Sequence, residues 1–279
     1  MPHLDEIRDR IANVGQIEGV IVAMRAMAAA HAQEARKHLR AIREHEATVA
    51  RSMAEALSMA PAGESGPPPR GAIRHLRIVV GAAQGFSGLY NERIVSGALE
   101  LGEKGENRCF MLVGQRCLSE FAERGITPDW SASMVAHAAE VPALASNIVD
   151  ALFSRLDSGE VQSVSVVYVD PDSSGQALTV RTLMPFDFSR IERAQSLVPP
   201  LTMIDPQLLI ARLVEEYVFT EICEALMLGF AAENDARMNA MTRARSNVKH
   251  IAQDLQRKFH QARQEETTTE IIELSSGAS

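Results

Sequence analysis

Both ends of the chain carry the apolar spacing of long helices that pack against another helix. Apolar side chains recur there at alternating steps of three and four residues, which is the spacing of a coiled-coil seam. The seam positions are Leu4, Ile7, Ile11, Val14, Ile21, Ala28, Ala35, Leu39, Ile42, Val49 and Met53 at the front, and Met241, Ala244, Val248, Ile251, Leu255, Phe259 and Ala262 at the back, after an upstream run through Leu208, Leu213, Val218, Ile222 and Leu226. We therefore predict that the terminal helices, roughly 80 and 100 Å long, pair with each other.

The middle of the chain alternates between strands and helices. The proline- and glycine-rich stretch 61–71 ends the first helix near Met59, and a second long helix starts at Asp205–Pro206, an N-cap followed by proline. Between them we predict strands at 76–81, 108–114, 161–169 and 177–186, the last two forming a hairpin, and helices at 88–103, 115–124 and 142–156. The expected fold is of the α/β class: a long antiparallel coiled coil of the N- and C-terminal helices with an inserted Rossmann-like α/β domain. Its domains are a shaft helix at 1–60, the α/β domain at 72–204 and a shaft helix at 205–279.

Composition excludes several functions. The formal charge of −8 and the pI near 5.5 argue against a nucleic-acid binder, which neutralises phosphates with Lys and Arg. Three cysteines without CxxC spacing predict neither a disulfide framework nor a zinc site. No stretch approaches 18 apolar residues, and the mixed-charge start is unlike a signal peptide, so we expect no direct membrane insertion.

Local motifs predict no catalytic, cofactor-binding or metal site. The glycine-rich run 81–89 follows a strand but lacks the Lys-Ser/Thr of a phosphate loop, and it misses the GxSxG spacing by one position. His31, His38 and His45 are seven residues apart, about 10.5 Å of helical rise, which is too far for one metal ion. Glu233 and Arg237, four apart, are most often a solvent-exposed helical pair.

Two classes of protein share part of this pattern of long terminal helices around an α/β domain. A doubly wound nucleotide-binding enzyme would need the phosphate loop that the 81–89 run lacks. A passive coiled-coil scaffold or chaperone arm would share the long helices but would not need the inserted α/β domain.

One segment favours a third class of protein over these two. Residues 232–247, AENDARMNAMTRARSN, resemble the signature near the C-terminus of the gamma subunit of F-type ATP synthases. The start of the chain is similar to the opening pattern of that family, at Ile7-Arg8, Ile11-Ala12, Val14, Ala23-Met24 and Ala28-Ala29. The resemblance covers the whole chain. It departs at residues 83–91, where an Asp, a Cys and one Gly of the family pattern are missing, as in a divergent gamma subunit or one from an alternative, sodium-translocating F-type ATPase.

The resemblance implies a central rotor stalk that couples transmembrane proton or sodium flow to ATP synthesis or hydrolysis on the beta subunits. It implies a non-catalytic subunit without cofactor, present in one copy per complex. Its partners would be the alpha and beta subunits of the F1 hexamer, the epsilon subunit and the membrane c-ring, at the cytoplasmic face of the bacterial plasma membrane as a peripheral protein. The residues expected to contact the hexamer are Met24, Glu233, Arg237, Gln264, Thr268 and Glu270.

Overall fold

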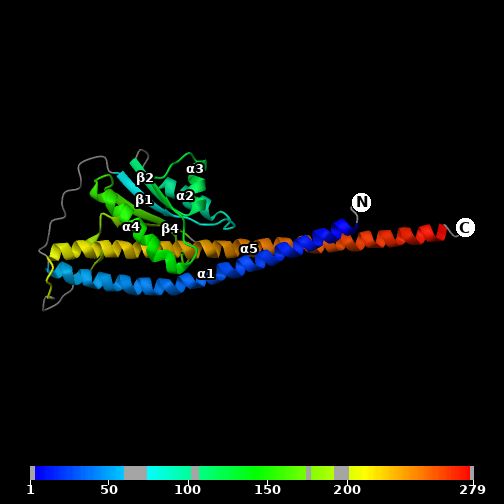
Figure 1. Cartoon of the computed structure of the whole chain (residues 1–279), viewed down its shortest axis with the longest axis horizontal. Helices are drawn as coiled ribbons and strands as arrows, with labels where there is room; N and C mark the ends of the chain where they lie inside the picture. Colours follow the sequence, from blue (N-terminus) through cyan, green and yellow to red (C-terminus); the bar gives the residue numbers. More distant parts are fainter. Residues whose placement is uncertain (1–3, 60–73, 102–106, 174–176, 192–200, 277–279) are drawn as a thin grey trace. The chain divides into compact units, whose positions relative to one another are not determined.

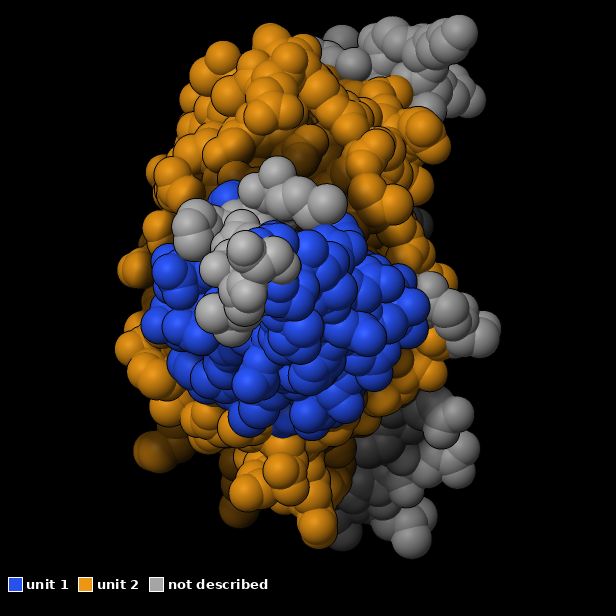
Figure 2. All heavy atoms as spheres, turned by 90° about the vertical axis from the view of Figure 1, so that its right-hand side faces the viewer, with its two compact units in different colours: residues 1–29, 237–279 blue, residues 30–236 orange. Residues whose placement is uncertain are grey.

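The fold combines two very long helices with one sheet (Figure 1). The computed structural model describes residues 4–59, 74–101, 107–173, 177–191 and 201–276. Helix α1 spans Leu4–Met59 and helix α5 spans Pro206–Ser276. Internal contacts divide the chain into two compact units: residues 1–29 with 237–279, and residues 30–236 (Figure 2). Both long helices have residues in each unit.

The sheet lies within the unit 30–236 and has five strands in the order β3-β2-β1-β4-β5. The strands are β1 (Arg74–Val80), β2 (Asn107–Val113), β3 (Trp130–Ala132), β4 (Ser163–Val169) and β5 (Leu178–Met184). The first four are parallel, and β5 returns antiparallel to β4. In β1 and β2 all seven residues are in register, from Arg74 opposite Asn107 to Val80 opposite Val113.

Helices cover both faces of this sheet. The remaining elements are α2 (Tyr90–Glu100), α3 (Gln115–Glu123), α4 (Val141–Asp157) and the short 3-10 turns η1 (Ala138–Glu140) and η2 (Phe188–Arg190). Alternate residues of β1 face opposite sides, so Ile78 packs in a cluster with α4 and α5 while Val79 packs with α2 and α3. A parallel sheet buried on both faces is the doubly wound arrangement.

The central part of α5 is buried on all sides. From residue 217 to 234 every side chain except the half-buried Phe219 is buried. Helix α5 packs on the sheet closely enough that a Cβ on Gly229 would lie 2.5 Å from Val80 Cγ1. Because this segment is buried around its whole circumference, it is the central core element of the unit 30–236.

The two long helices are antiparallel within each unit. In the unit 30–236, Arg36 pairs with Asp235 at 2.6 Å and His45 Nε2 lies 2.8 Å from a Glu216 carboxylate oxygen. In the other unit, Arg245 lies 3.4 Å from Glu18, and the Arg8 guanidinium lies 6.0 Å from the centre of the Phe259 ring. In each unit, later residues of α5 meet earlier residues of α1, as the seams predict.

Most predicted elements are confirmed. Helix α1 ends at Met59, and the Asp205 carboxylate caps α5 by accepting the N–H groups of Gln207 and Leu208. The four predicted strands, the three predicted helices and the β4–β5 hairpin are all present. The stretch 61–71 lies outside the described residues. Strand β3 was not predicted, because three residues are too few to show a period of two.

The predicted seam is confirmed at most positions. Ile7, Ala28, Ala35 and Met53 are at most 4% exposed. Ile251, in contrast, is 51% exposed, because a two-helix pair covers only one side of each helix. The domain boundaries at 60, 72 and 204 stay a prediction.

Gly229→Ala should destabilise the chain, because the added methyl group meets Val80. We expect overpacking to cost about 1–3 kcal/mol, offset by up to about 1 kcal/mol of improved helix propensity. Gly19→Ala on α1 is the matched control, since nothing lies within 4 Å of its Cβ position. Urea unfolding should show a loss for Gly229→Ala and a small gain for the control. Equal gains would contradict the close helix–sheet contact.

Candidate functional site

The loop after β1 is closed by a carboxylate from α5. It runs from Gly81 to Leu89 at the carboxyl edge of the sheet, where doubly wound folds bind their ligands. Backbone N–H groups of Ala83 and Gln84 donate to the two Glu233 carboxylate oxygens at 3.1 and 3.3 Å. Glu233 is only 2% exposed. Amides that would face a phosphate in a nucleotide-binding loop are thus bound to an anion of the chain itself.

The same loop presents two apolar side chains to solvent. Phe86 and Leu89 are 69% and 68% exposed, while Ser87 between them is buried. Phe86 has a φ of 63°, in the left-handed region, which costs a bulky residue roughly 1–2 kcal/mol. The amide of Ala82 donates to Asn91 Oδ1 at 2.9 Å, so side chains fix this loop on both sides of its turn.

The six residues expected to contact the hexamer have different environments. Glu233 and Arg237 are 2% and 7% exposed, so their interpretation as a solvent-exposed pair is wrong. This burial could not be predicted, because the local spacing of residues does not show the loop that packs against Glu233. Met24 is half-buried. Partner contact by these three residues stays a prediction.

The other three residues lie near the end of α5 and are exposed: Gln264, Thr268 and Glu270. The Thr268 hydroxyl donates to the Gln264 carbonyl oxygen at 2.7 Å, within the helix. Since Arg8 lies over Phe259 and α1 is described from Leu4, the turns of α5 beyond about residue 264 extend past the described start of α1. Contact of these residues with a partner also stays a prediction.

Sequence reasoning missed an ionic network in the unit 30–236, in which two buried acids bind partly exposed arginines. Glu224 accepts hydrogen bonds from Arg43 of α1 at 2.8 Å and from Arg181 of β5 at 2.7 Å. Glu221 accepts one from Arg190 of η2 at 2.6 Å and lies 3.7 Å from Arg181. Glu221 is 1% exposed and Glu224 is 5% exposed. The sequence signal that could have indicated this network is the presence of acids inside the apolar run 217–232, because a buried charge needs a partner.

The network shifts the pKa values of its two acids in opposite directions. Burial raises the pKa of Glu221 above its ordinary value of 4.5, and the attraction of Arg190 only partly offsets this. Burial acts on Glu224 as well, but hydrogen bonds from Arg43 and Arg181 outweigh it and lower the pKa. The negative charge of Glu224 is therefore favoured by the fold, whereas that of Glu221 is tolerated at a cost.

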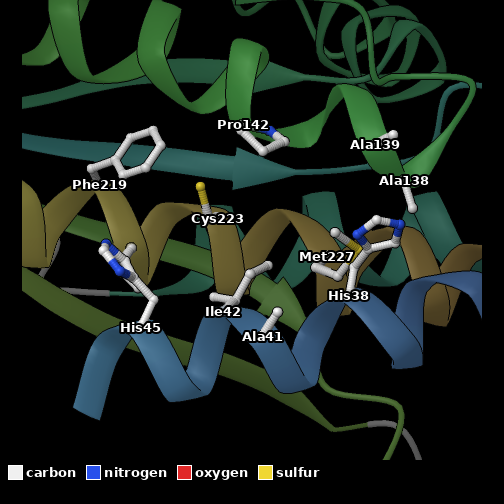
Figure 3. A pocket seen from close by; sticks show the side chains of 11 residues that line it. His38, Ala41, Ile42, His45, Ala138, Ala139, Pro142, Phe219, Cys223 and Met227 are labelled. Carbon is white, nitrogen blue, oxygen red and sulfur yellow. The ribbon is translucent and has the colours of Figure 1, made fainter. Parts of the chain in front are cut away.

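A cavity of about 390 Å³ lies in the same unit (Figure 3). Side chains from α1, α5, η1 and the start of α4 line it, among them Ile42, Cys223, Met227, Ala138 and Pro142. Burial raises the pKa of the Cys223 thiol to about 12, so this cysteine is not a thiolate at neutral pH. The lining can hold an apolar group but does not supply an activated nucleophile.

The described parts of the chain contain no group of three or more His, Cys, Asp or Glu side chains placed to hold a metal ion. His31, one of the three heptad-spaced histidines, instead contacts the rings of His137 and Phe230, with centroid distances of 6.1 and 5.9 Å. Among these same residues, none of the helices is both long and apolar enough to span a bilayer.

Comparisons with known proteins agree with this architecture. A family model described as ATP synthase matches residues 3–279. The ATP synthase gamma chain of Cyanothece sp. is 29% identical over 315 residues, an alignment that covers all of this chain and 99% of that one. The gamma chain of Ruegeria pomeroyi is 28% identical over 295 residues, with the same coverage.

Solved structures show the same fold. A chain in the rotor of the Euglena gracilis mitochondrial ATP synthase matches with a TM-score of 0.65 at 12% identity, over 94% of this chain and 98% of that chain. A chain in the central stalk and c-ring structure of the Tetrahymena thermophila enzyme matches with a TM-score of 0.54 at 16% identity, over 81% and 99%.

The chain belongs to the ATP synthase family, and within it to the gamma chains. Its function is that of the central-stalk subunit of an F-type ATP synthase, and its fold is the predicted coiled coil with an inserted α/β domain.

Glu233→Gln should loosen the 81–89 loop, because a neutral amide accepts backbone N–H groups more weakly than a carboxylate does. We expect a loss of about 1–2 kcal/mol in local stability, and hydrogen exchange at Ala83 and Gln84 should accelerate by roughly tenfold. Glu215→Gln, which removes an exposed partner of Arg212, is the control and should change neither rate. Unchanged protection in Glu233→Gln would show that its charge does not hold the loop.

Glu224→Gln and Glu221→Gln should lower the free energy of unfolding by different amounts at pH 7. Because the pKa of Glu224 is lowered by folding, its charge stabilises the fold above its ordinary pKa of 4.5, and this stability is lost as pH falls through the lowered value. The raised pKa of Glu221 has the opposite sign: it favours the fold at low pH, and that contribution is lost as pH rises through the raised pKa.

We therefore expect Glu224→Gln to cost about 1–3 kcal/mol at pH 7 and Glu221→Gln to cost less. The Glu224→Gln deficit should shrink as pH falls from about 4.5, the ordinary pKa, through the lowered pKa of the folded state. Chemical unfolding across this pH range measures both effects. The reverse ranking of the two variants at pH 7 would contradict the assigned directions.

Proposed function

We propose that this chain transmits torque, as the rotating shaft between an ion-driven ring of membrane c subunits and a hexamer of alpha and beta subunits. It acts in one copy per complex, with the epsilon subunit beside it, peripherally at the cytoplasmic face of the bacterial plasma membrane. The flow of protons or sodium ions turns the shaft during ATP synthesis, and ATP hydrolysis turns it in reverse. The chain itself catalyses no step.

The end of α5 is the observation that carries this proposal. Beyond about residue 264 the helix extends past the described start of α1, and its described side chains are exposed, including Ile271 and Ile272 at 61% and 59%. An isolated helix in water gains too little from backbone hydrogen bonds to be stable without packing. A surrounding collar of subunits would supply the missing contacts and cover the two isoleucines.

The energetics of ion-driven synthesis require a stiff shaft. One charge that crosses 100 mV supplies only roughly 2.3 kcal/mol, so several crossings must be summed into one ATP. Pairing of α1 with α5 in both units, through Arg36–Asp235 in one and Glu18–Arg245 in the other, supports resistance to bending. Torque can then be carried without being dissipated in the shaft.

The asymmetry of the shaft is the means of control over the beta subunits. Each beta subunit would meet a different face of the helix pair and would be biased to a different conformation and nucleotide affinity, because differential contact free energy is what shifts such an equilibrium. Gln264, Thr268 and Glu270 are exposed and suited to direct contact. Glu233 would act by holding the 81–89 loop, with its exposed Phe86 and Leu89, in a fixed conformation.

A non-catalytic role is favoured by the loop chemistry. The amides of Ala83 and Gln84, which a phosphate would need, are already bound to Glu233. Calorimetry on the isolated, folded chain should therefore detect no ATP binding. A passive scaffold or chaperone arm would also bind no ATP, so assembly must separate the two functions.

Co-purification tests the proposal. The affinity-tagged chain should bring down alpha and beta subunits in a stoichiometric complex with a single copy of the chain, together with epsilon and the c-ring when membranes are solubilised gently. The ion-binding residues of the recovered c subunit identify the coupling ion. Recovery of the chain without alpha and beta subunits would contradict the rotary function.

Gln264→Ala combined with Thr268→Ala should reduce coupling before it affects assembly. Each polar contact is worth roughly 0.5–1.5 kcal/mol, which is small beside the apolar contact of a shaft with its collar. The matched control is Glu265→Ala with Thr269→Ala, an exposed pair one position along the helix with the same internal hydroxyl bond.

The measurement is ATP-driven ion pumping per ATP hydrolysed in membrane vesicles. The ratio should fall in the Gln264/Thr268 variant and fall less in the control. An unchanged ratio in an intact complex would show that these two residues are only surface positions, and loss of the complex would show that they carry the binding energy.

A further inference from the structure

We propose that Glu221 and Glu224 form a joint that fixes the rotation of α5 about its own axis, and that torque passes through this joint between the α/β domain and the helix pair. The inference rests on the proposed rotary function and concerns only the unit 30–236, in which all five residues of the network lie.

Apolar packing restricts the rotation of this helix most tightly at one point, where Gly229 approaches Val80. Residues 217–234 of α5 are buried around the whole circumference, and many are alanine, leucine or methionine. Apolar contacts are non-directional, and cores tolerate repacking when volume is conserved. Away from Gly229, a small rotation or slide of α5 would therefore exchange one apolar contact for another, so torque applied to the sheet could be lost as slip.

The network supplies directional contacts from three elements. Glu224 binds Arg43 of α1 through Oε1 at 2.8 Å and Arg181 of β5 through Oε2 at 2.7 Å, so one carboxylate links the helix pair to the sheet. Glu221, about one turn earlier, binds Arg190 of η2 at 2.6 Å. Arg181 lies between the two acids, 3.7 Å from Glu221.

This arrangement resists rotation in both directions. The arginines belong to α1, β5 and η2, which approach α5 from separate parts of the unit, and charge-assisted hydrogen bonds of this length are the strong ones. Because successive helix positions are about 100° apart, turning α5 by one position would break the contacts of both acids together.

Stability explains only part of the network, because the fold favours the charge of Glu224 but not that of Glu221. A buried ion pair often contributes no more than apolar residues of the same volume would, although it can specify one arrangement among several. Glu221 is 1% exposed, and its Oε2 atom is buried without a hydrogen-bond partner among the described residues. Because the charge of Glu221 is costly, we infer that it serves to fix the position of α5 rather than to stabilise the fold.

Replacing charged residues of the network by apolar ones separates a role in stability from a role in fixing the position of α5. The variant combines Arg43→Met, Arg181→Met and Glu224→Met, and its control combines Arg212→Met with Glu215→Met, an exposed pair on the same helix. In assembled complexes in membrane vesicles, ATP hydrolysis should continue in both. Ion pumping per ATP should fall by roughly twofold or more in the triple variant, the size of effect that changes within a coupling network produce.

The control should keep the wild-type ratio, and urea unfolding of the isolated triple variant should show that it remains folded, so that a loss of coupling is not a loss of structure. An unchanged pumping ratio in an assembled triple variant would overturn the joint. A wild-type complex that fails to pump, in contrast, would count against the proposed function itself.

A second measurement needs no assembly. Spin labels at Ala122→Cys on α3 and Ala211→Cys on α5, both exposed, report the position of α5 relative to the sheet, and the native cysteines are buried from the reagent. The distance distribution between the labels should be broader in the triple variant than in the otherwise wild-type chain. Equal widths would overturn the proposal even if the variant fails to enter the complex.

Discussion

The burial of residues 217–234 of α5 on all sides is the constraint on which the rest of the unit 30–236 depends. One side of this segment packs on the sheet, where Gly229 approaches Val80, and other sides are covered by α1 and α4. Burial of so much apolar surface at about 25 cal/mol per Å² is the main stabilisation available. The sheet, α4 and α1 are all positioned by their packing against this one helix.

The same burial explains where the polar chemistry lies. Charged groups carried into the core by α5 must find partners in the elements that surround the helix. Glu221 and Glu224 bind arginines from three elements, and Glu233 binds the backbone of the 81–89 loop. As a result, a helix that carries no catalytic group still fixes both the sheet and a loop with exposed apolar side chains.

Prediction from sequence succeeded where a period extends over many residues. The seams from Ile7 to Met53 and the N-cap at Asp205 identified both long helices, and apolar runs bounded by turns identified four of the five strands. Tertiary partners leave no local signal, so Glu233 looked like one half of a surface pair and the Arg181 network was not foreseen. The roles given to Gln264, Thr268 and Glu270 came from family resemblance and stay predictions.

Direct observation of rotation tests the central claim most directly. With alpha and beta subunits held on a surface and a bead attached at an exposed Ala122→Cys on α3, addition of ATP should turn the bead continuously in one direction. The buried native cysteines leave the attachment point defined. ATP hydrolysis by the same complexes without bead rotation would contradict the account, because it would show that the chain does not follow the conformational changes of the hexamer.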